Sequence, residues 1–360
     1  MRCRWRVRAI LLLVGLLVFL AACDDRSSVS FYDGHLEAAV RDALGIERGP
    51  LTSAAVRRLT ELDASDREIS RLDGIEECVS LIRLDVSENH VSDLRPLEAL
   101  RSLEELILRS NRIEDVEPLS GLPELRILDL DFNSIVDIAP LRDLVKLRWL
   151  GLWNSRIGDL KPVRGLVELR ELGLGGNPIG DPSPLAGLTR LEWLGLPNTG
   201  IEDLAFIADM GEMRELGLEG NRIRDLAPLA GLRNLAKLGL GLNEIVDVSP
   251  LGALTSLRQL SLWGNRIVDI APLAALVGLE KLWLDGNPID DISSLVNLTS
   301  LRILGLAETG VSNLTPLLEN RSLGEGAEVD LTGLQPSSNA ETRDQIERLE
   351  DRGITVRYDR

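Results

Sequence analysis

Aromatic residues are scarce in this chain of 360 residues, at 3% against a hydrophobic content of 44%. There are only four phenylalanines and two tyrosines, so leucine and other aliphatic side chains must fill the interior. An interior built from one kind of side chain, used many times, is typical of proteins made of stacked repeats. The composition therefore directs attention to internal periodicity.

Histidine and cysteine are nearly absent. The two histidines, His35 and His90, fall in different elements, which leaves too few groups for a zinc site or a histidine-based triad. Of the three cysteines, Cys3 and Cys23 lie in or beside the N-terminal segment, and one remaining thiol cannot form a disulfide framework. Cys78 occupies a repeat position that leucine fills elsewhere, so we expect it to be buried. We predict no cofactor, no metal site and no catalytic residue.

Positive charge is also in short supply. Lys and Arg number 40 against 57 Asp and Glu, for a formal net charge of −17. Binding to a phosphate backbone needs clustered cations, so nucleic acid is not expected as a partner.

The N-terminus has the features of an export signal. Four arginines precede an apolar run, residues 9–22, that is too short to span a bilayer. The run ends Leu20-Ala21-Ala22-Cys23, which resembles the lipobox of bacterial lipoproteins. The resemblance implies a signal peptide over residues 1–22, lipidation of Cys23 and a lipidated tether over residues 23–30. The alternative is an ordinary signal peptide with an incidental cysteine.

The lipobox resemblance also implies a location. A lipidated chain would be exported and anchored by its acyl chains at the bacterial cell envelope. Asp24 and Asp25 follow the cysteine. In enterobacterial lipoproteins, Asp at this place favours retention at the inner membrane, so the sequence leans toward that membrane but leaves the side open.

Residues 59–322 form twelve repeats of 22 residues without an insertion or deletion. The repeats follow the pattern L-x-x-L-x-L-x-x-N-x-I, as in Leu103-Leu106-Leu108-Asn111-Ile113. The Asn position is filled instead by Ser155, Thr199 and Thr309 in three repeats and by Arg67 in the atypical first repeat. In L-x-L the two leucines point inward and the residue between them points to solvent, which predicts one short parallel strand per repeat. The Asn side chains are expected to satisfy turn amides that the sheet leaves unpaired.

The second half of each repeat carries Asp and then, in most repeats, Pro. The Asp column runs through ten consecutive repeats from Asp93 to Asp291. Asp can cap the amides that follow it, and Pro suits a first helical turn, so short 3₁₀ segments are expected on the convex side. Much of the acidity therefore reflects structural repetition.

The repeat resembles the leucine-rich repeat of the internalin-like bacterial class. The resemblance implies an α/β solenoid with a parallel, concave β-sheet, a convex side of short 3₁₀ segments, and capped ends. Residues 31–58 predict a helical N-terminal cap, with helices behind Asp33 and after Thr52. Residues 323–360 predict a mixed C-terminal cap with a thirteenth strand, a helix ended by Gly353 and a last strand.

Five tryptophans occupy outward positions of the predicted strands. Exposed tryptophan is costly and is a frequent interface anchor, so these residues are predicted to bind a ligand: Trp149, Trp153, Trp193, Trp263 and Trp283. The alternative is that they pack on one another and merely cover the sheet.

Glycine fills the central outward position in five successive repeats, from Gly151 to Gly239. A flat strip with aromatic flanks would admit an extended peptide, a protein loop or a glycan chain, so Gly173, Gly195 and Gly217 join the predicted binding residues. The alternative is that repeat duplication copied a glycine without consequence.

The N-terminal part of the same face is acidic, with Asp63, Asp85, Asp129 and Asp131 outward. Asp63 and Asp85 lie on adjacent strands and offer the best case for catalysis or for a calcium site. An open face supplies neither the gripping cleft of a glycosidase nor the six or more oxygens that calcium needs. Solvated carboxylates are the expected outcome.

These observations predict a monomeric, non-enzymatic lipoprotein at the cell envelope. Its concave face would bind a protein, as an adhesion or scaffold molecule. The alternative function is a carbohydrate-binding or peptidoglycan-binding module that uses the tryptophans to stack on sugars.

Overall fold

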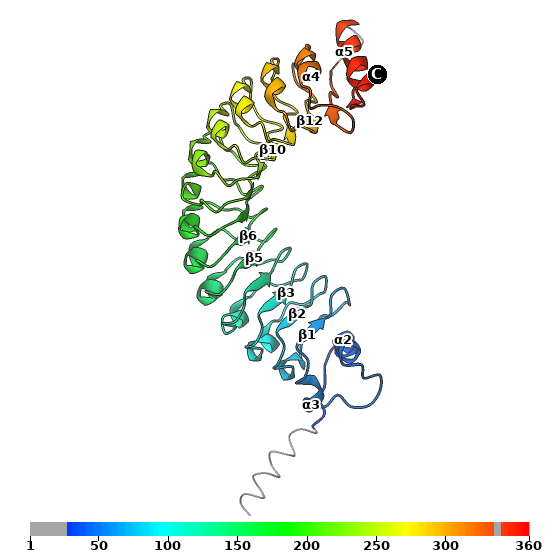
Figure 1. Ribbon diagram of the computed structural model, residues 1–360. Helices are drawn as coiled ribbons and strands as arrows, with labels where there is room; N and C mark the ends of the chain where they lie inside the picture. The colour runs from blue at the N-terminus through cyan, green and yellow to red at the C-terminus, as the bar shows by residue number, and fades with distance from the viewer. Residues whose placement is uncertain (1–26, 335–339, 360) are drawn as a thin grey trace, which may run out of the picture. The chain divides into compact units, whose positions relative to one another are not determined.

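The computed structural model describes residues 27–334 and 340–359 (Figure 1). The described residues form two compact units, which meet between residues 147 and 148 of the sequence. Cys23 and the predicted signal peptide over residues 1–22 lie outside the described residues. Within the described ranges, no helix combines the length and apolarity needed to cross a membrane.

The first unit begins with two helices, α2 (Gly34–Leu44) and α3 (Ser53–Val56). Asp33 starts α2, because its Oδ1 accepts hydrogen bonds from the amides of His35 and Leu36 at 2.9 and 3.3 Å. Thr52 starts α3 in the same way, with its hydroxyl accepting from the amide of Ala55 at 3.2 Å. The predicted helical cap is confirmed.

Four parallel strands follow in chain order in the first unit. The residue in the middle of each strand pairs with its equivalent one repeat away, as Leu62 does with Leu84. The strands are β1 (Glu61–Asp63), β2 (Arg83–Asp85), β3 (Glu105–Ile107) and β4 (Ile127–Asp129), and the 3₁₀ helices are η2 (Ile75–Glu77), η3 (Arg95–Ala99), η4 (Glu117–Leu119) and η5 (Ala139–Asp143).

The second unit continues the pattern with ten strands, each parallel to the next in chain order. The strands are β5 (Trp149–Gly151), β6 (Glu171–Gly173), β7 (Trp193–Gly195), β8 (Glu215–Gly217), β9 (Lys237–Gly239), β10 (Gln259–Ser261), β11 (Lys281–Trp283), β12 (Ile303–Gly305), β13 (Glu328–Asp330) and β14 (Thr355–Arg357). The helices are η6 (Lys161–Gly165), η7 (Ser183–Gly187), η8 (Ala205–Ile207), η9 (Ala227–Gly231), η10 (Ser249–Ala253), η11 (Ala271–Ala275), η12 (Ser293–Asn297), α4 (Thr315–Glu319) and α5 (Ala340–Asp351).

The leucine register is as predicted. Strands β1 to β12 each begin two residues after the first residue of a repeat, and the middle residue of every one of these strands is buried. Leu172 and Leu194, for example, are 0% exposed, while the residues on either side of them face away from the core. The predicted fold class, a parallel-sheet repeat solenoid with 3₁₀ segments and capped ends, is confirmed. The exact domain boundaries stay predictions.

Asparagine side chains link consecutive repeats. In Asn221, Oδ1 accepts from the amides of Thr199 and Ile201 at 3.0 and 3.1 Å, and Nδ2 donates to the carbonyls of Leu196 and Leu218, both at 2.9 Å. Similar bonds recur at Asn89, Asn111, Asn133, Asn177, Asn243, Asn265 and Asn287. The column therefore satisfies backbone groups that the short strands leave unpaired, as predicted.

The aspartate column starts the 3₁₀ helices. Asp225 Oδ1 accepts from the amide of Ala227, the first residue of η9, at 2.8 Å. Nine further aspartates make the equivalent bond, so the predicted capping role is confirmed. Ten of the 57 acidic side chains are thus used in these turns.

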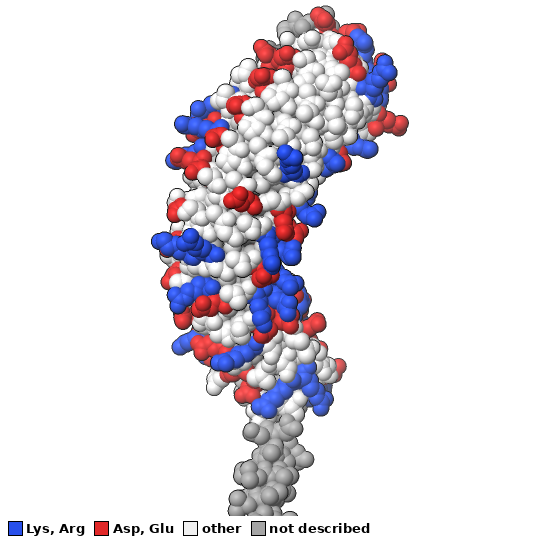
Figure 2. All heavy atoms as spheres, turned by 60° about the vertical axis from the view of Figure 1, so that its left-hand side comes forward, with Lys and Arg blue, Asp and Glu red and all other residues white. Residues whose placement is uncertain are grey.

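In the second unit the strands line the inner side of the stack and the 3₁₀ helices line the outer side (Figure 1). Acidic and basic side chains lie next to one another over much of the surface in Figure 2. Several pairs join adjacent repeats, including Arg224 with Glu244 at 2.7 Å. Exposed pairs of this kind contribute little to stability.

Cys78 is 0% exposed, and burial raises the pKa of its thiol to about 12. A thiol held neutral in an apolar interior is a poor nucleophile. The prediction that Cys78 replaces a core leucine is confirmed.

Candidate functional site

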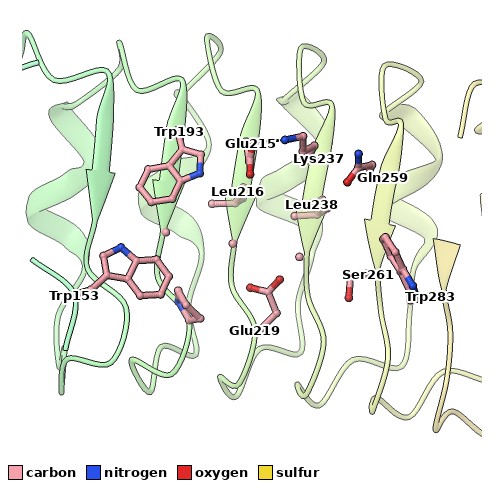
Figure 3. Close-up of a pocket in the computed structure, with 14 residues that line it drawn as sticks. Trp153, Trp193, Glu215, Leu216, Glu219, Lys237, Leu238, Gln259, Ser261 and Trp283 are labelled. Carbon is pink, nitrogen blue, oxygen red and sulfur yellow. Dashed lines mark hydrogen bonds and ion pairs between the residues drawn. The ribbon is translucent and has the colours of Figure 1, made fainter. Parts of the chain in front are cut away.

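The inner face of the second unit contains a hollow of about 300 Å³ (Figure 3). Each repeat presents three outward positions there: the first residue of the strand, the third residue, and the second residue after the strand. The hollow, called the aromatic hollow below, is lined by Trp153, Trp193, Gly195, Pro197, Glu215, Leu216, Gly217, Glu219, Lys237, Leu238, Gly239, Gln259, Ser261 and Trp283.

Indole rings form two opposite walls of the aromatic hollow. Trp153 and Trp193 stack, with ring centroids 6.4 Å apart and planes inclined by 26°, and Trp283 stands at the other end (Figure 3). All three side chains are half-exposed. The alternative that tryptophans pack on one another is thus correct for Trp153 and Trp193, yet the pair still offers indole surface to solvent.

Glycines form the base of the aromatic hollow and also make room for its wall. A Cβ on Gly195 would lie 2.8 Å from Cζ2 of Trp153 and 2.9 Å from the ring of Trp193, closer than real contacts allow. Gly173 and Gly175 are similarly crowded by Trp153. Gly217 and Gly239 lie further along and are half-covered, with the carboxylate of Glu219 above them.

Polar groups border the hollow on both sides. Glu215 accepts a hydrogen bond from Nζ of Lys237 at 2.9 Å on the side of the first outward position. Glu219 lies on the side of the third outward position, with its carboxylate directed over the glycine base (Figure 3). A flat base, aromatic ends and a few fixed polar groups are what an extended ligand needs.

Comparisons with known proteins agree with the repeat fold. Residues 101–143 match the family described as leucine-rich repeats (two copies). An internalin of Listeria monocytogenes is 29% identical, with a TM-score of 0.73 over 81% of this chain and 94% of the internalin. The chain has the leucine-rich-repeat fold.

Other solved structures share the fold. A leucine-rich-repeat protein of Leptospira interrogans is 19% identical, with a TM-score of 0.62 over 84% of this chain and 96% of that one. The plant peptide hormone receptor RGFR1 in complex with RGF2 is 19% identical, with a TM-score of 0.60 over 85% of this chain and 57% of that chain. No curated protein matches the chain.

The leucine-rich-repeat structure brings together five of the eight predicted binding residues. Trp153, Trp193, Trp283, Gly195 and Gly217 all line the aromatic hollow. The other three do not line it. Trp149 is half-exposed at the start of β5, Trp263 is 39% exposed and lies over Gly241, and Gly173 lies beneath Trp153.

Several lining residues were not among those predicted. Glu219 and Pro197 occupy the third outward position, the same column as Trp153 and Trp263. The repeat register places this position on the inner face, so Glu219 and Pro197 could have been predicted from the sequence to lie on it. Lys237, Gln259 and Ser261 carry no distinguishing signal, because polar residues at outward positions are the ordinary case.

The proposed carboxylate pair in the first unit does not form a catalytic arrangement. Asp63 and Asp85 are register partners, but each Oδ1 accepts from the amide and hydroxyl of its own serine, Ser65 and Ser87. The hydrogen bonds from Ser65 lower the pKa of Asp63, the opposite of what a general acid needs. In the described part of the chain, no group of three His, Cys, Asp or Glu side chains could hold a metal ion.

The prediction that Asp129 is a solvated carboxylate is wrong. Asp129 is 8% exposed, and burial raises the pKa of its carboxyl above the ordinary value. Its Oδ1 accepts from the amide of Asp131 at 3.0 Å. An outward position on a β-strand is therefore not always exposed to solvent.

Proposed function

We propose that this leucine-rich-repeat protein is a non-enzymatic binding protein, an adhesion or scaffold molecule, that holds another protein in the aromatic hollow. The single observation that carries the proposal is the half-exposed indoles of Trp193 and Trp283 at opposite ends of an open glycine base. Tryptophan side chains in hollows of this kind are frequent centres of binding energy, since they bury much area with little loss of conformational freedom.

The fold supports a binding role. Each repeat consists of a short strand and a 3₁₀ helix, so that successive repeats build an extended inner face. This face is the usual binding surface for partners in solenoid proteins. One protein of the same fold, the plant receptor RGFR1, is described as in complex with RGF2. We extend this role to the present chain as a proposal, since a fold alone does not name a ligand.

The geometry of the acidic residues favours binding over catalysis. Asp63 and Asp85 are each held by a neighbouring serine, and no clustered metal ligands occur in the part of the chain that the structure describes. The aromatic hollow contains no histidine or cysteine to act as a base or nucleophile.

We further propose that Cys23 is lipidated and that the protein is exported and anchored at the bacterial cell envelope as a monomer. The lipobox-like segment that ends at Cys23 supports this anchor. Asp24 and Asp25 favour the inner membrane. Metabolic labelling with a fatty-acid analogue tests the anchor, since Cys23→Ala removes the label only if Cys23 carries it.

Carbohydrate is the second candidate ligand, because the half-exposed indole faces could also stack on sugar rings. The two candidates are separated by presenting the purified protein to an array of short peptides and to an array of envelope glycans. Capture of peptides supports protein binding, whereas capture of glycans alone supports the second candidate.

The test of the site uses matched tryptophan variants. Trp193→Ala and Trp283→Ala remove walls of the hollow, and each should weaken capture by about 2 kcal/mol or more, about thirtyfold. Trp149→Ala and Trp263→Ala change the same residue type on the same face but outside the hollow, so they should bind nearly as the wild type does. Equal losses in all four variants would contradict the proposed site.

A further inference from the structure

One carboxylate in the aromatic hollow is left without a partner. Glu219 follows β8 at the third outward position and is half-buried. Its carboxylate lies over the glycine base, where a Cβ on Gly239 would overlap it and a Cβ on Gly217 would lie 3.3 Å from Oε2. The side chain is thus held inside the hollow instead of extending into solvent (Figure 3).

Nearby carboxylates on the same face are already neutralised or hydrogen-bonded. Glu215 is paired with Lys237 at 2.9 Å. Asp285 accepts from the amide of Ala307 at 2.8 Å. Within the described residues, the carboxylate of Glu219 has no hydrogen-bond donor and no cation, so its charge is available to a ligand.

The surroundings of Glu219 favour a cationic group. The faces of the Trp153 and Trp193 indoles carry negative potential and attract ammonium and guanidinium ions, and a carboxylate beside them strengthens that attraction. The formal charge of −17 acts in the same direction over longer distances. A bare metal ion would find one carboxylate and too few oxygens there.

We propose that the aromatic hollow binds an extended peptide segment through a lysine or arginine side chain. The cationic end would pair with Glu219, and the aliphatic stem would lie against Trp153 and Trp193. From β7 to β11 the hollow crosses four strand spacings, about 19 Å, which is the length of about six extended residues. The far end of the segment would then reach Trp283. This proposal rests on the proposed binding function and names the chemistry of its partner.

Short random peptides, about seven residues long, are selected for binding to the purified wild-type protein and, separately, to variants of Glu219. Glu219→Gln keeps the shape of the side chain and removes its charge. Peptides selected by the wild type should be enriched in Lys or Arg, and Glu219→Gln should bind them about tenfold more weakly and with less dependence on salt. Glu219→Lys should select Asp-containing or Glu-containing peptides instead.

Glu171→Gln is the matched control. Glu171 lies on the same face, is exposed and does not line the hollow, so its loss should change the affinity for the selected peptides by less than about twofold. Thermal unfolding of each variant checks that the fold is retained. Near-equal weakening in Glu171→Gln and Glu219→Gln would show a general charge effect and overturn the proposal.

Failure of this proposal is distinguishable from failure of the proposed function. Peptides that need Trp193 and Trp283 but show no preference for Lys or Arg would overturn the basic-side-chain proposal and leave protein binding standing. Undiminished binding of Lys or Arg peptides to Glu219→Gln would do the same. Capture of no peptide by the wild type would overturn both.

Discussion

The indole of Trp153 lies against Gly195, two repeats further along the chain, so closely that a Cβ on this glycine would lie 2.8 Å from Cζ2 of the ring. The same added atom would lie 2.9 Å from the ring of Trp193. Gly195 therefore has a physical role in seating the aromatic wall, and the explanation that duplication copied it without consequence is not needed at this position.

Gly195→Ala is expected to destabilise the protein by about 1–2 kcal/mol. The added methyl group would crowd the two indoles, and this cost exceeds the stability gained when a flexible glycine is replaced in a strand. Gly217→Ala is the matched control. Its Cβ would meet only the flexible end of Glu219, at 3.3 Å, so this variant should be unchanged or more stable by about 0.5–1 kcal/mol. Urea unfolding gives both values. Equal stability of the two variants would contradict the seating role.

Asn221→Ala is expected to lower the free energy of unfolding by about 2–5 kcal/mol. The change leaves buried amides of Thr199 and Ile201 and the carbonyl of Leu196 without their partner. Asn221→Thr should cost less, since a hydroxyl can keep one bond, as Thr199 does with Leu196 in its own repeat. The control is Asn234→Ala, which removes a single exposed bond to Gly211. Urea midpoints that do not separate Asn221→Ala from Asn234→Ala would refute the role of the column.

Arg352 ties the C-terminal segment to the last repeats. Its guanidinium donates to the carbonyls of Leu317, Leu318, Asn320 and Leu323. Arg352→Lys cannot reach all four acceptors, so amide hydrogen exchange should accelerate in residues 340–359 while the first unit is unaffected. Arg348→Lys, which alters only an exposed pair with Asp344, is the control. Unchanged exchange in Arg352→Lys would contradict the proposed tie.

Burial of Asp129 predicts a pH dependence of stability. Its pKa is higher in the folded protein than in the unfolded chain, so the folded state binds the proton more tightly. The stability from this group is fully present below the unfolded pKa of about 3.9 and is lost as pH rises through the raised folded pKa. Asp129→Asn should therefore be more stable than the wild type at neutral pH, and the difference should shrink toward about pH 3.

Asp93 should show the opposite sign. Hydrogen bonds from Arg95 lower the pKa of Asp93 to about 2. Its contribution to stability is therefore present above the unfolded pKa of about 3.9 and is lost as pH falls through the folded pKa. Asp93→Asn should then be less stable than the wild type at neutral pH, by a small amount because the pair is exposed. Urea midpoints of both variants and of the wild type, measured from neutral pH down to about pH 3, test both predictions. If both variants were more stable than the wild type at neutral pH, or both less stable, the opposite pKa shifts of Asp129 and Asp93 would be contradicted.

Much of the fold could be predicted from the sequence because the repeat fixes the register. A shift of one residue would turn every leucine of L-x-L to the solvent, so the pattern alone places Leu194 in the core and Trp193 and Gly195 outside it. The roles of the Asn and Asp columns could be predicted equally well, since the side chains of each column bond to backbone groups at a constant separation along the chain.

The direction of outward side chains could not be predicted in this way. Trp149 and Trp153 flank the same strand at outward positions, yet only Trp153 turns over the neighbouring glycines and lines the hollow. Which way a ring leans depends on the size of side chains on the next strands, and that information lies one or two repeats away in the sequence.

Oxidative footprinting of the protein with and without its best captured ligand tests the central claim most directly, since the face carries its own reporters. Bound ligand should protect Trp153, Trp193 and Trp283 from hydroxyl-radical oxidation, and it should leave Trp149 and Trp263 as reactive as in the free protein. Protection of Trp149 and Trp263 with no change at Trp193 and Trp283 would place the ligand elsewhere and contradict the account.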